Sequence, residues 1–349
     1  MTASLAARVT QVVDARIASD PRFSRLGRAR TRLPGQSSDE EARSGNPRSA
    51  RSATSFRDAS PAPYTACVKH AILGAGGVGG LIGAALARAG EDVVLLMREE
   101  SRRAYGGVMQ VESVVLGDFE VDVRAAPVLE GAVDVLWVTP KATQLEPALT
   151  LAPPGVVNGA RVVTLMNGVD HLRLLQSRYE HVIGGAIRVE SERVSPGHIR
   201  QASPFIRVEL SDGQDIVDLL ALAGFEAELG PAAGSILWQK LAFLAPLALS
   251  TTAYDKTLGQ VRQREDFQAC QAETVAIAKA EGATLDIEAL EALTSGAPAE
   301  MRSSMQKDKA KGLPLELDAI AGPIIRGGVA HEIATPATEH LKSIIEGMA

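Results

Sequence analysis

The sequence has few cysteines, no excess of positive charge and no long apolar run. Its two cysteines, Cys67 and Cys270, are too few for a disulfide framework or a cysteine-based zinc site, which fits a reducing, cytoplasmic setting. The net charge of −6 leaves no basic field that would attract nucleic acid. The longest apolar run, Leu241 to Leu249, is much shorter than a membrane span. We therefore expect a globular protein that binds neither nucleic acid nor a membrane.

The composition changes abruptly near residue 68. Residues 1–67 contain eleven arginines, no lysine and several clusters of Ser, Pro and Gly, a composition typical of disorder. An arginine- and serine-rich start also resembles a transit peptide, but five acidic residues count against that interpretation: Asp14, Asp20, Asp39, Glu40 and Glu41. We expect residues 1–67 to be a disordered extension without a catalytic role. Translation would then begin near Val68, downstream of the first Met.

A glycine-rich run follows the first apolar strand. Gly74, Gly76 and Gly79 come after Ala71 to Leu73 and open an apolar helix, the context of a nucleotide-binding turn. The first glycine makes the turn, the second lets the backbone approach a pyrophosphate, and the third lets the helix pack on the strand. A phosphate would lie at the helix N-terminus. The predicted cofactor-binding residues of the turn are Gly74, Ala75, Gly76, Gly77, Val78 and Gly79.

Arg98 stands at the end of the second predicted strand, where a carboxylate would normally hold the ribose hydroxyls of NAD. A guanidinium can instead pair with the extra phosphate of NADP. The sequence therefore predicts NADPH as the cofactor. The alternative is that Arg98 is one surface arginine among many.

From residue 68 onward, strand and helix patterns alternate, which is typical of a doubly wound parallel sheet. We predict an α/β, Rossmann-type NADP-binding domain over residues 68–231 and an all-helical substrate and dimerisation domain over residues 232–349. The predicted strands are 69–74, 92–97, 134–139 and 161–166, and the predicted helices lie near 78–89, 143–151, 169–178, 260–281, 287–295 and 314–325. Residues 108–115 and 119–124 alternate like an inserted hairpin.

Lys240 is the only positive charge in the apolar segment from Ile236 to Leu249. Burial lowers the pKa of an ammonium group towards the operating pH, which suits a proton donor or a group that polarises a carbonyl. The alternative is a lysine whose stem packs in the core while its charged end reaches water.

Six motifs occur in an order that resembles the ketopantoate reductase (2-dehydropantoate 2-reductase) family. The resemblance covers the chain from about Val68 to the C-terminus. It includes the spacing of twelve residues from Ser304 to Glu316. The motifs are Gly74–Gly80, Arg98, Thr139–Gln144, Met166–Val169, Trp238–Leu241 and Ser303–Asp308 with Leu315–Asp318.

The resemblance implies a role for each matching residue. Lys240 would be the general acid that protonates the C2 oxygen of a 2-oxo acid, and Glu316 would orient the resulting hydroxyl. Asn167 would lie beside the nicotinamide and the substrate, Lys141 would contact the cofactor, and Ser304 would help to hold the substrate carboxylate. Each residue also has an ordinary interpretation: a turn at Asn167-Gly168, solvated charges at Lys141 and Glu316, and a helix cap at Ser304.

The sequence departs from the family one and two helical turns after Lys240. Leu244 and Ala248 stand where the family usually has asparagines, and Met301 stands where it tends to be polar. Losing two amides that hydrogen-bond a substrate can cost orders of magnitude in discrimination. Pro246 in the same segment should kink a helix and free the carbonyl of Ala242.

The resemblance predicts NADPH-dependent reduction of 2-dehydropantoate to pantoate, in pantothenate and coenzyme A biosynthesis. One alternative is a paralogous reductase of a more apolar 2-oxo acid, which Leu244 and Ala248 would suit. Another is a non-enzymatic NADPH-sensing regulator, which would not need Lys240 and Glu316. The six histidines show no metal-ligand spacing, so we predict no metal site. A homodimer is an expectation from the family alone.

Overall fold

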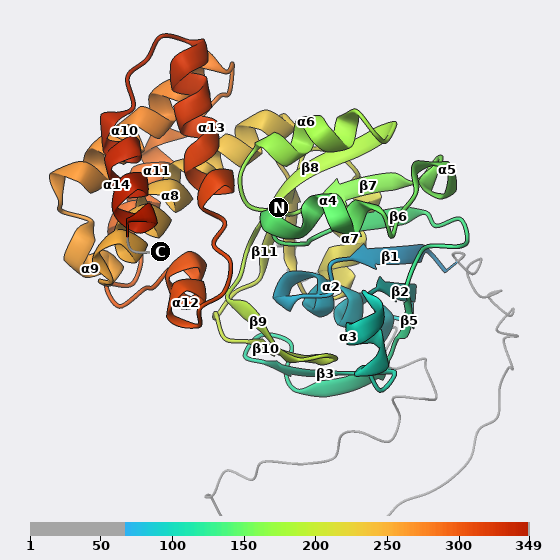
Figure 1. Cartoon of the computed structure of the whole chain (residues 1–349). Helices are drawn as coiled ribbons and strands as arrows, with labels where there is room; N and C mark the ends of the chain where they lie inside the picture. Colours follow the sequence, from blue (N-terminus) through green and yellow to red (C-terminus); the bar gives the residue numbers. More distant parts are fainter. Residues whose placement is uncertain (1–66, 348–349) are drawn as a thin grey trace, which may run out of the picture. The chain divides into compact units, whose positions relative to one another are not determined.

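The computed structural model describes residues 67–347, coloured in Figure 1. The expected extension over residues 1–67 lies outside the described residues, apart from Cys67. The main sheet contains β1 (Lys69–Leu73), β2 (Asp92–Leu96), β5 (Arg124–Ala126), β6 (Val135–Val138), β7 (Arg161–Thr164), β8 (His181–Arg188), β11 (Arg207–Leu210) and β12 (Glu226–Leu229). Their order is β12-β11-β8-β7-β6-β1-β2-β5. Neighbouring strands are parallel except β8 and β11, which are antiparallel.

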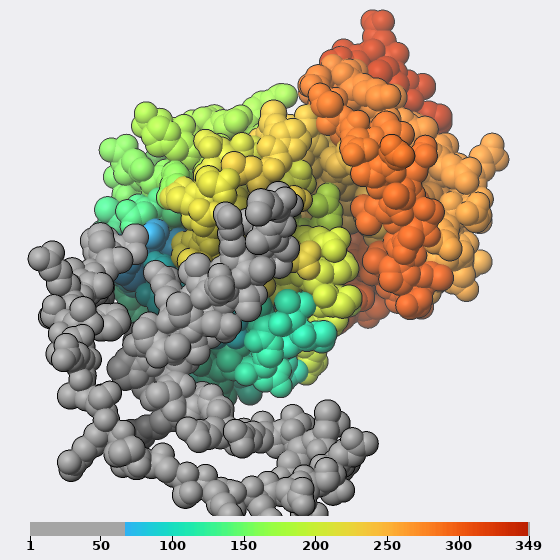
Figure 2. Space-filling model, turned by 180° about the vertical axis from the view of Figure 1, so that it is seen from behind, coloured from blue at the N-terminus to red at the C-terminus, as the bar shows by residue number. Residues whose placement is uncertain are grey.

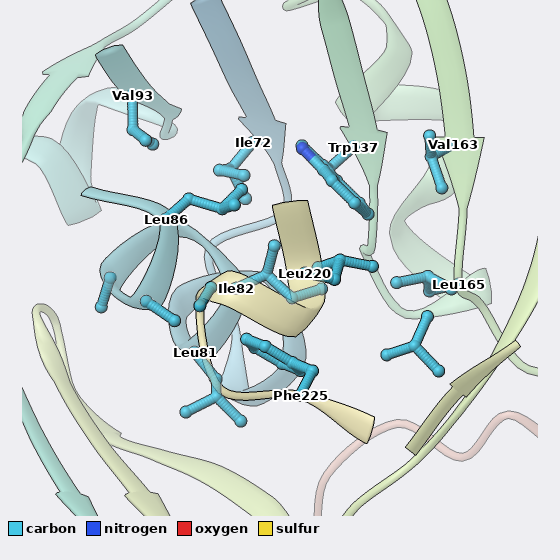
Figure 3. Close-up of a cluster of buried hydrophobic side chains, with 14 of the residues drawn as sticks. Ile72, Leu81, Ile82, Leu86, Val93, Trp137, Val163, Leu165, Leu220 and Phe225 are labelled. Atoms are coloured by element: carbon cyan, nitrogen blue, oxygen red, sulfur yellow. The ribbon is translucent and has the colours of Figure 1, made fainter. Parts of the chain in front are cut away.

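Helices cover both faces of this sheet, because alternate side chains of its strands point to opposite sides. On one face, Ile72 and Trp137 pack against α2 and α7 (Figure 3). On the other face, Leu73 and Val138 pack against α4 and α6. The helices of this part are α2 (Gly77–Arg88), α3 (Glu99–Arg103), α4 (Leu145–Leu149), α5 (Pro154–Val157), α6 (Asp170–Gln176) and α7 (Gln214–Leu222), with a 3₁₀ turn, η1, at Ala142–Gln144. The predicted α/β class is confirmed.

A second sheet packs on α2. Its strands β3 (Val108–Ser113) and β4 (Phe119–Asp122) are antiparallel, which confirms the predicted hairpin. The hairpin is joined by β9 (Ser191–Ser195) and β10 (His198–Gln201), in the order β4-β3-β10-β9. A Cβ at Gly80 of α2 would lie 2.5 Å from Ile199 Cδ1, so the missing side chain lets this sheet approach the helix.

The chain becomes helical after β12, as predicted. The helices are α8 (Ala233–Tyr254), α9 (Leu258–Val261), α10 (Glu265–Ala280), α11 (Ile287–Gly296), α12 (Ser304–Ala310), α13 (Leu317–Ala330) and α14 (Pro336–Glu346). The predicted single helix over residues 260–281 is two helices, because α9 ends at Val261 and α10 begins at Glu265. From behind, the orange helices of this part form the surface beside the yellow and green residues of the α/β part (Figure 2). The division predicted at residue 231 falls between β12 and α8.

Helix α8 is the centre of the helical core. It is long and apolar enough to cross a membrane, but most of its apolar stretch is buried by the other helices. Pro246 lies inside it and cannot donate to the Ala242 carbonyl. That carbonyl instead accepts a hydrogen bond from Gln271 Nε2 of α10, at 3.4 Å. The polar group that the proline leaves free in α8 is therefore satisfied by a neighbouring helix.

Candidate active site

The glycine turn between β1 and α2 has the geometry of a phosphate cradle. Gly74 has φ +94°, and a Cβ there would lie 2.5 Å from the backbone nitrogen of Pro140. A Cβ at Gly79 would overlap the Thr139 hydroxyl and the Gly74 carbonyl. At Gly76 a Cβ would meet only the Gly74 carbonyl oxygen, at 4.0 Å, so this backbone is open to a ligand. The turn thus requires glycine at positions 74 and 79, and Gly76 leaves room for a ligand to approach the backbone.

Helix α2 begins at Gly77 without a side-chain cap, so the N–H groups of its first turn have no side-chain partner. The other three residues predicted to bind the cofactor pack within the protein. Ala75 is buried, Val78 packs against the core, and Gly77 lies against the Ser191 backbone. The Thr139 hydroxyl lies 3.1 Å and 3.0 Å from the carbonyl oxygens of Leu73 and Gly74 and can donate to either. This helix N-terminus fits a dinucleotide pyrophosphate.

Two cations flank the turn at the same edge of the sheet. Arg98 follows β2 and is exposed, and Lys141 follows β6. Because β1 lies between β6 and β2, both cations stand beside the glycine turn at the carboxyl ends of the strands. Arg98 makes none of the ion pairs found within residues 67–347. The Lys141 ammonium donates to Asp308 Oδ2 at 2.6 Å, so it is an ion-paired side chain.

Glu316 and Asn167 meet directly. Glu316 is 7% exposed, just before α13, and its Oε2 accepts a hydrogen bond from Asn167 Nδ2 at 3.1 Å. Its Oε1 accepts from the backbone N–H of Ala142 at 2.9 Å. The interpretation of Glu316 as a solvated charge is therefore wrong. The Glu316 carboxylate, 149 residues from Asn167 in sequence, is held just after the end of β7.

Lys240 is partly buried on α8. The pKa of Lys240 is lowered to about 8, first by burial of the ammonium group and then by the positive charge of Arg188, while the negative charge of Glu316 opposes both. Glu316 and Arg188 are therefore both close enough to interact with Lys240 through their charges. An ammonium group in this setting is a better proton donor near neutral pH than an ordinary lysine.

His171 lies on α6 and is 6% exposed. Its burial, and then the nearby charge of Lys240, lower its pKa to about 4, so it is neutral at pH 7. Its Nε2 has no hydrogen-bond partner within the described part of the chain. A cleft of about 350 Å³ lies beside these groups. It is lined on one side by η1, α4 and α6 and on the other by the start of α13, and it includes Asn167, His171 and Glu316.

Ser304 does not join this cluster. It is exposed at the first residue of α12, and no hydrogen bond within residues 67–347 connects its side chain to Lys240, Asn167 or Glu316. The residue that caps α12 is Ser303, whose hydroxyl accepts from Gln306 N at 3.1 Å. Its Oγ also lies 2.8 Å from Thr251 Oγ1 of α8. The interpretation of Ser304 as the cap is wrong by one residue.

The positions that depart from the family pattern pack in the helical part of the protein. Leu244 is partly buried against the helical core, and Ala248 is fully buried within it. Because they follow Lys240 by four and eight residues, they lie on its face of α8. Met301 packs against a small cluster that contains Leu247 and Phe267. No group of three or more metal-ligating side chains occurs in residues 67–347.

The chain matches two family models in sequence order. Residues 70–213 match the model described as "Ketopantoate reductase PanE/ApbA", and residues 234–349 match its C-terminal counterpart. The chain belongs to the ketopantoate reductase family. Members of this family are NAD(P)-dependent reductases of 2-oxo acids.

Two relatives align over similar shares of the chain. A 2-dehydropantoate 2-reductase of Caulobacter vibrioides is 28% identical over 80% of this chain and 98% of its own length. An uncharacterized oxidoreductase of Bacillus subtilis, YkpB, is 27% identical over 78% of this chain and 96% of its own. The chain is therefore about equally similar to a 2-dehydropantoate 2-reductase and to an oxidoreductase that is described as uncharacterized.

Solved structures agree on the fold. The 2-dehydropantoate 2-reductase of Geobacter metallireducens has a TM-score of 0.74, at 26% identity over 81% of this chain and all of that one. A D-mandelate dehydrogenase solved with NADH has a TM-score of 0.71, at 22% identity over 80% of this chain and 98% of that one. The second likeness is one of fold alone.

Sequence reasoning missed three residues of the site. Asp308 stands in a quoted motif but received no role, although it pairs with Lys141. His171 and Arg188 lie near Lys240 and belong to no motif. Their position follows from the packing of α6, β8 and α8, which no local pattern predicts.

Proposed function

We propose that this protein catalyses the NADPH-dependent reduction of a 2-oxo acid, with 2-dehydropantoate as the substrate and pantoate as the product. The observation that carries the proposal is the buried Glu316 carboxylate, fixed by Asn167 and the Ala142 N–H at the carboxyl edge of the sheet, whose charge acts on the buried ammonium group of Lys240. Two 2-dehydropantoate 2-reductases, of Caulobacter vibrioides and Geobacter metallireducens, support it. The reaction would serve pantothenate and coenzyme A biosynthesis in the cytoplasm.

The residues of the glycine turn fit the cofactor. The open backbone at Gly76 and the N-terminus of α2 would hold the pyrophosphate. Arg98 would pair with the additional phosphate of NADPH, and Lys141 would bind on the same side. When bound, the nicotinamide supplies a hydride.

Lys240 would act on the substrate oxygen. Addition of a hydride to C2 places negative charge on that oxygen, and the ammonium group would stabilise this charge and then transfer its proton. A pKa of about 8 keeps Lys240 protonated at pH 7 and makes the proton easier to lose than that of an ordinary lysine. Glu316, held by Asn167 and the Ala142 N–H, would accept a hydrogen bond from the new hydroxyl. Asn167 would contact the nicotinamide and the substrate, and Ser304 would approach the substrate carboxylate only if α12 moves.

A second candidate is the reduction of a more apolar 2-oxo acid. It is favoured by Leu244 and Ala248, apolar residues that follow Lys240 by one and two turns of α8 and pack in the helical core. Both candidates use the same proton donor and differ in the side chain of the substrate. A homodimer is part of the proposal, since a ketopantoate reductase of Staphylococcus aureus is described as dimeric.

The test is the loss of reduced-nicotinamide absorbance with the full chain and a panel of 2-oxo acids. Turnover of 2-dehydropantoate above all others supports the first candidate, and a preference for 2-oxo acids with apolar side chains supports the second. Tight NADPH binding without turnover of any of them would favour a sensor of reduced nicotinamide. Turnover that survives Lys240→Ala would remove Lys240 as the proton donor.

A further inference from the structure

Arg188 is a second cation beside Lys240. It ends β8, which lies next to β7 in the sheet. In the parallel register Thr164 of β7 pairs with Gly184 of β8, and Asn167 and Arg188 follow these residues by three and four positions. Arg188 therefore stands at the same carboxyl edge as Asn167, where ligands of such sheets bind.

Helix α8 brings Lys240 to this edge. A Cβ at Gly184 would overlap that of Ala233, so α8 begins directly against the middle of β8. Seven helical residues from Ala233 to Lys240 span about 10 Å, and four extended residues from Gly184 to Arg188 span about 13 Å. The two cations are close enough that the charge of Arg188 lowers the pKa of Lys240.

The guanidinium of Arg188 has an incomplete partner. Its Nη1 lies 3.6 Å from Glu209 Oε2 of β11, an ion pair without hydrogen-bond distance. The Arg188 side chain is 31% exposed, so donors of its planar group are open to a ligand. Glu209 is itself confined, because a Cβ at Gly230 would overlap its carboxylate. Arg188, whose partner Glu209 lies beyond hydrogen-bond distance, therefore keeps donors that can bind an added anion, while the charge of Lys240 is already opposed by Glu316.

We propose that Arg188 binds the carboxylate of the 2-oxo acid substrate while Lys240 holds the adjacent C2 oxygen. This inference rests on the proposed function. It identifies Arg188 as the residue that makes the site select substrates with a carboxylate. The carboxylate of a 2-oxo acid is bonded directly to C2, so its oxygens lie next to the C2 oxygen, and one cation for each group suits this arrangement. Leu244 and Ala248 offer no hydrogen bond to that carboxylate, and Ser304 is exposed elsewhere, so Arg188 supplies the anchor that these positions lack. Glu209 is the resting partner that the carboxylate displaces.

The decisive experiment compares a 2-oxo acid with its uncharged 2-oxo amide in the full chain. Arg188→Gln should lower kcat/KM for the acid by about 10- to 100-fold, as expected for a lost charge-assisted hydrogen bond. It should change kcat/KM for the amide and the Kd for NADPH by less than about threefold. Glu209→Gln should lower KM for the acid, because the competing carboxylate becomes neutral.

Arg207→Gln is the matched control. Arg207 pairs with Arg188 in the β8–β11 register, but it is exposed and ion-paired with Glu226 at 2.7 Å. Its replacement should affect neither substrate. Equal losses on acid and amide in Arg188→Gln, or no loss on either, would overturn the role of Arg188 and leave the proposed function standing.

If the wild-type chain binds NADPH but reduces no 2-oxo acid, the proposed function fails on its own. The role of Arg188 is then tested by measuring the binding of oxamate, which carries the same carboxylate, by calorimetric titration. Binding to the wild type that is lost in Arg188→Gln supports the anchor. Equal binding to both proteins, or binding to neither, overturns it.

Discussion

The Lys141 ammonium donates a hydrogen bond to the Asp308 carboxylate over 2.6 Å and so joins the end of β6 to α12. Two further ion pairs, Lys307 with Glu190 and Lys311 with Glu192, attach the same short helix and the residue after it to the β8–β9 segment. Lys141 is also a predicted cofactor ligand. A cofactor phosphate and Asp308 would therefore compete for one ammonium group.

This competition predicts opposite effects of two substitutions on cofactor affinity. Asp308→Asn should lower the Kd for NADPH a few-fold, because Lys141 loses its internal partner. Lys141→Ala should raise that Kd by roughly tenfold, the range of a charge-assisted hydrogen bond. Fluorescence titration of the reduced nicotinamide measures both. If Asp308→Asn weakens binding as much as Lys141→Ala does, the competition does not occur.

The pH dependence of kcat/KM should report the ionisation of Lys240. A general acid must be protonated in the free enzyme, so kcat/KM should fall as the pH rises through about 8. Arg188 lowers the pKa of Lys240, so Arg188→Gln should move this falling limb to higher pH. Glu316 raises the same pKa, so Glu316→Gln should move it to lower pH. A limb that stays in place in both variants would mean that another group titrates.

Arg98 should determine the choice between the two nicotinamide cofactors. Arg98→Ala should raise the KM for NADPH by about tenfold or more and leave the KM for NADH nearly unchanged, because only NADPH carries the additional phosphate. Arg124 is a suitable control, since this exposed arginine is ion-paired with Asp92 at 2.7 Å. An unchanged preference for NADPH in Arg98→Ala would contradict the assignment.

Two glycines of the turn should fail in different ways when replaced by alanine. Gly79→Ala places a methyl group on the Thr139 hydroxyl and the Gly74 carbonyl, so it should lower the melting temperature. Gly76→Ala meets no close atom, so the protein should fold normally but bind NADPH more weakly, because the methyl group occupies the approach to the backbone. Thermal unfolding and cofactor titration separate the two effects. Equal stability of both variants would count against the packing role of Gly79.

The parts of the fold that the sequence predicted are those with strong local patterns. The buried strands β1, β2, β6 and β7 are short apolar runs, and the hairpin alternates apolar and polar residues. The strand β9 was missed because it is almost entirely exposed, so no burial pattern marks it. The helix α14 was missed although Thr338, Leu341 and Ile345 form a buried stripe at helical spacing. That signal was present in the sequence.

The candidate site was predictable only where a motif names a residue. Glu316 and Asn167, which stand in separate motifs, do lie together. The contacts of Lys141 with Asp308 and of Arg188 with Glu209 depend on tertiary packing between distant elements, so composition and periodicity do not reveal them. The exposed position of Ser304 depends in the same way on where α12 docks.

The carboxylate of Glu316 has both oxygens engaged before any ligand arrives. Its rotamer freedom is lost when the chain folds, so an incoming molecule need not immobilise it. The entropic cost of ordering the Glu316 side chain therefore does not reduce the affinity for a ligand. Recognition at this carboxylate is rigid from the outset.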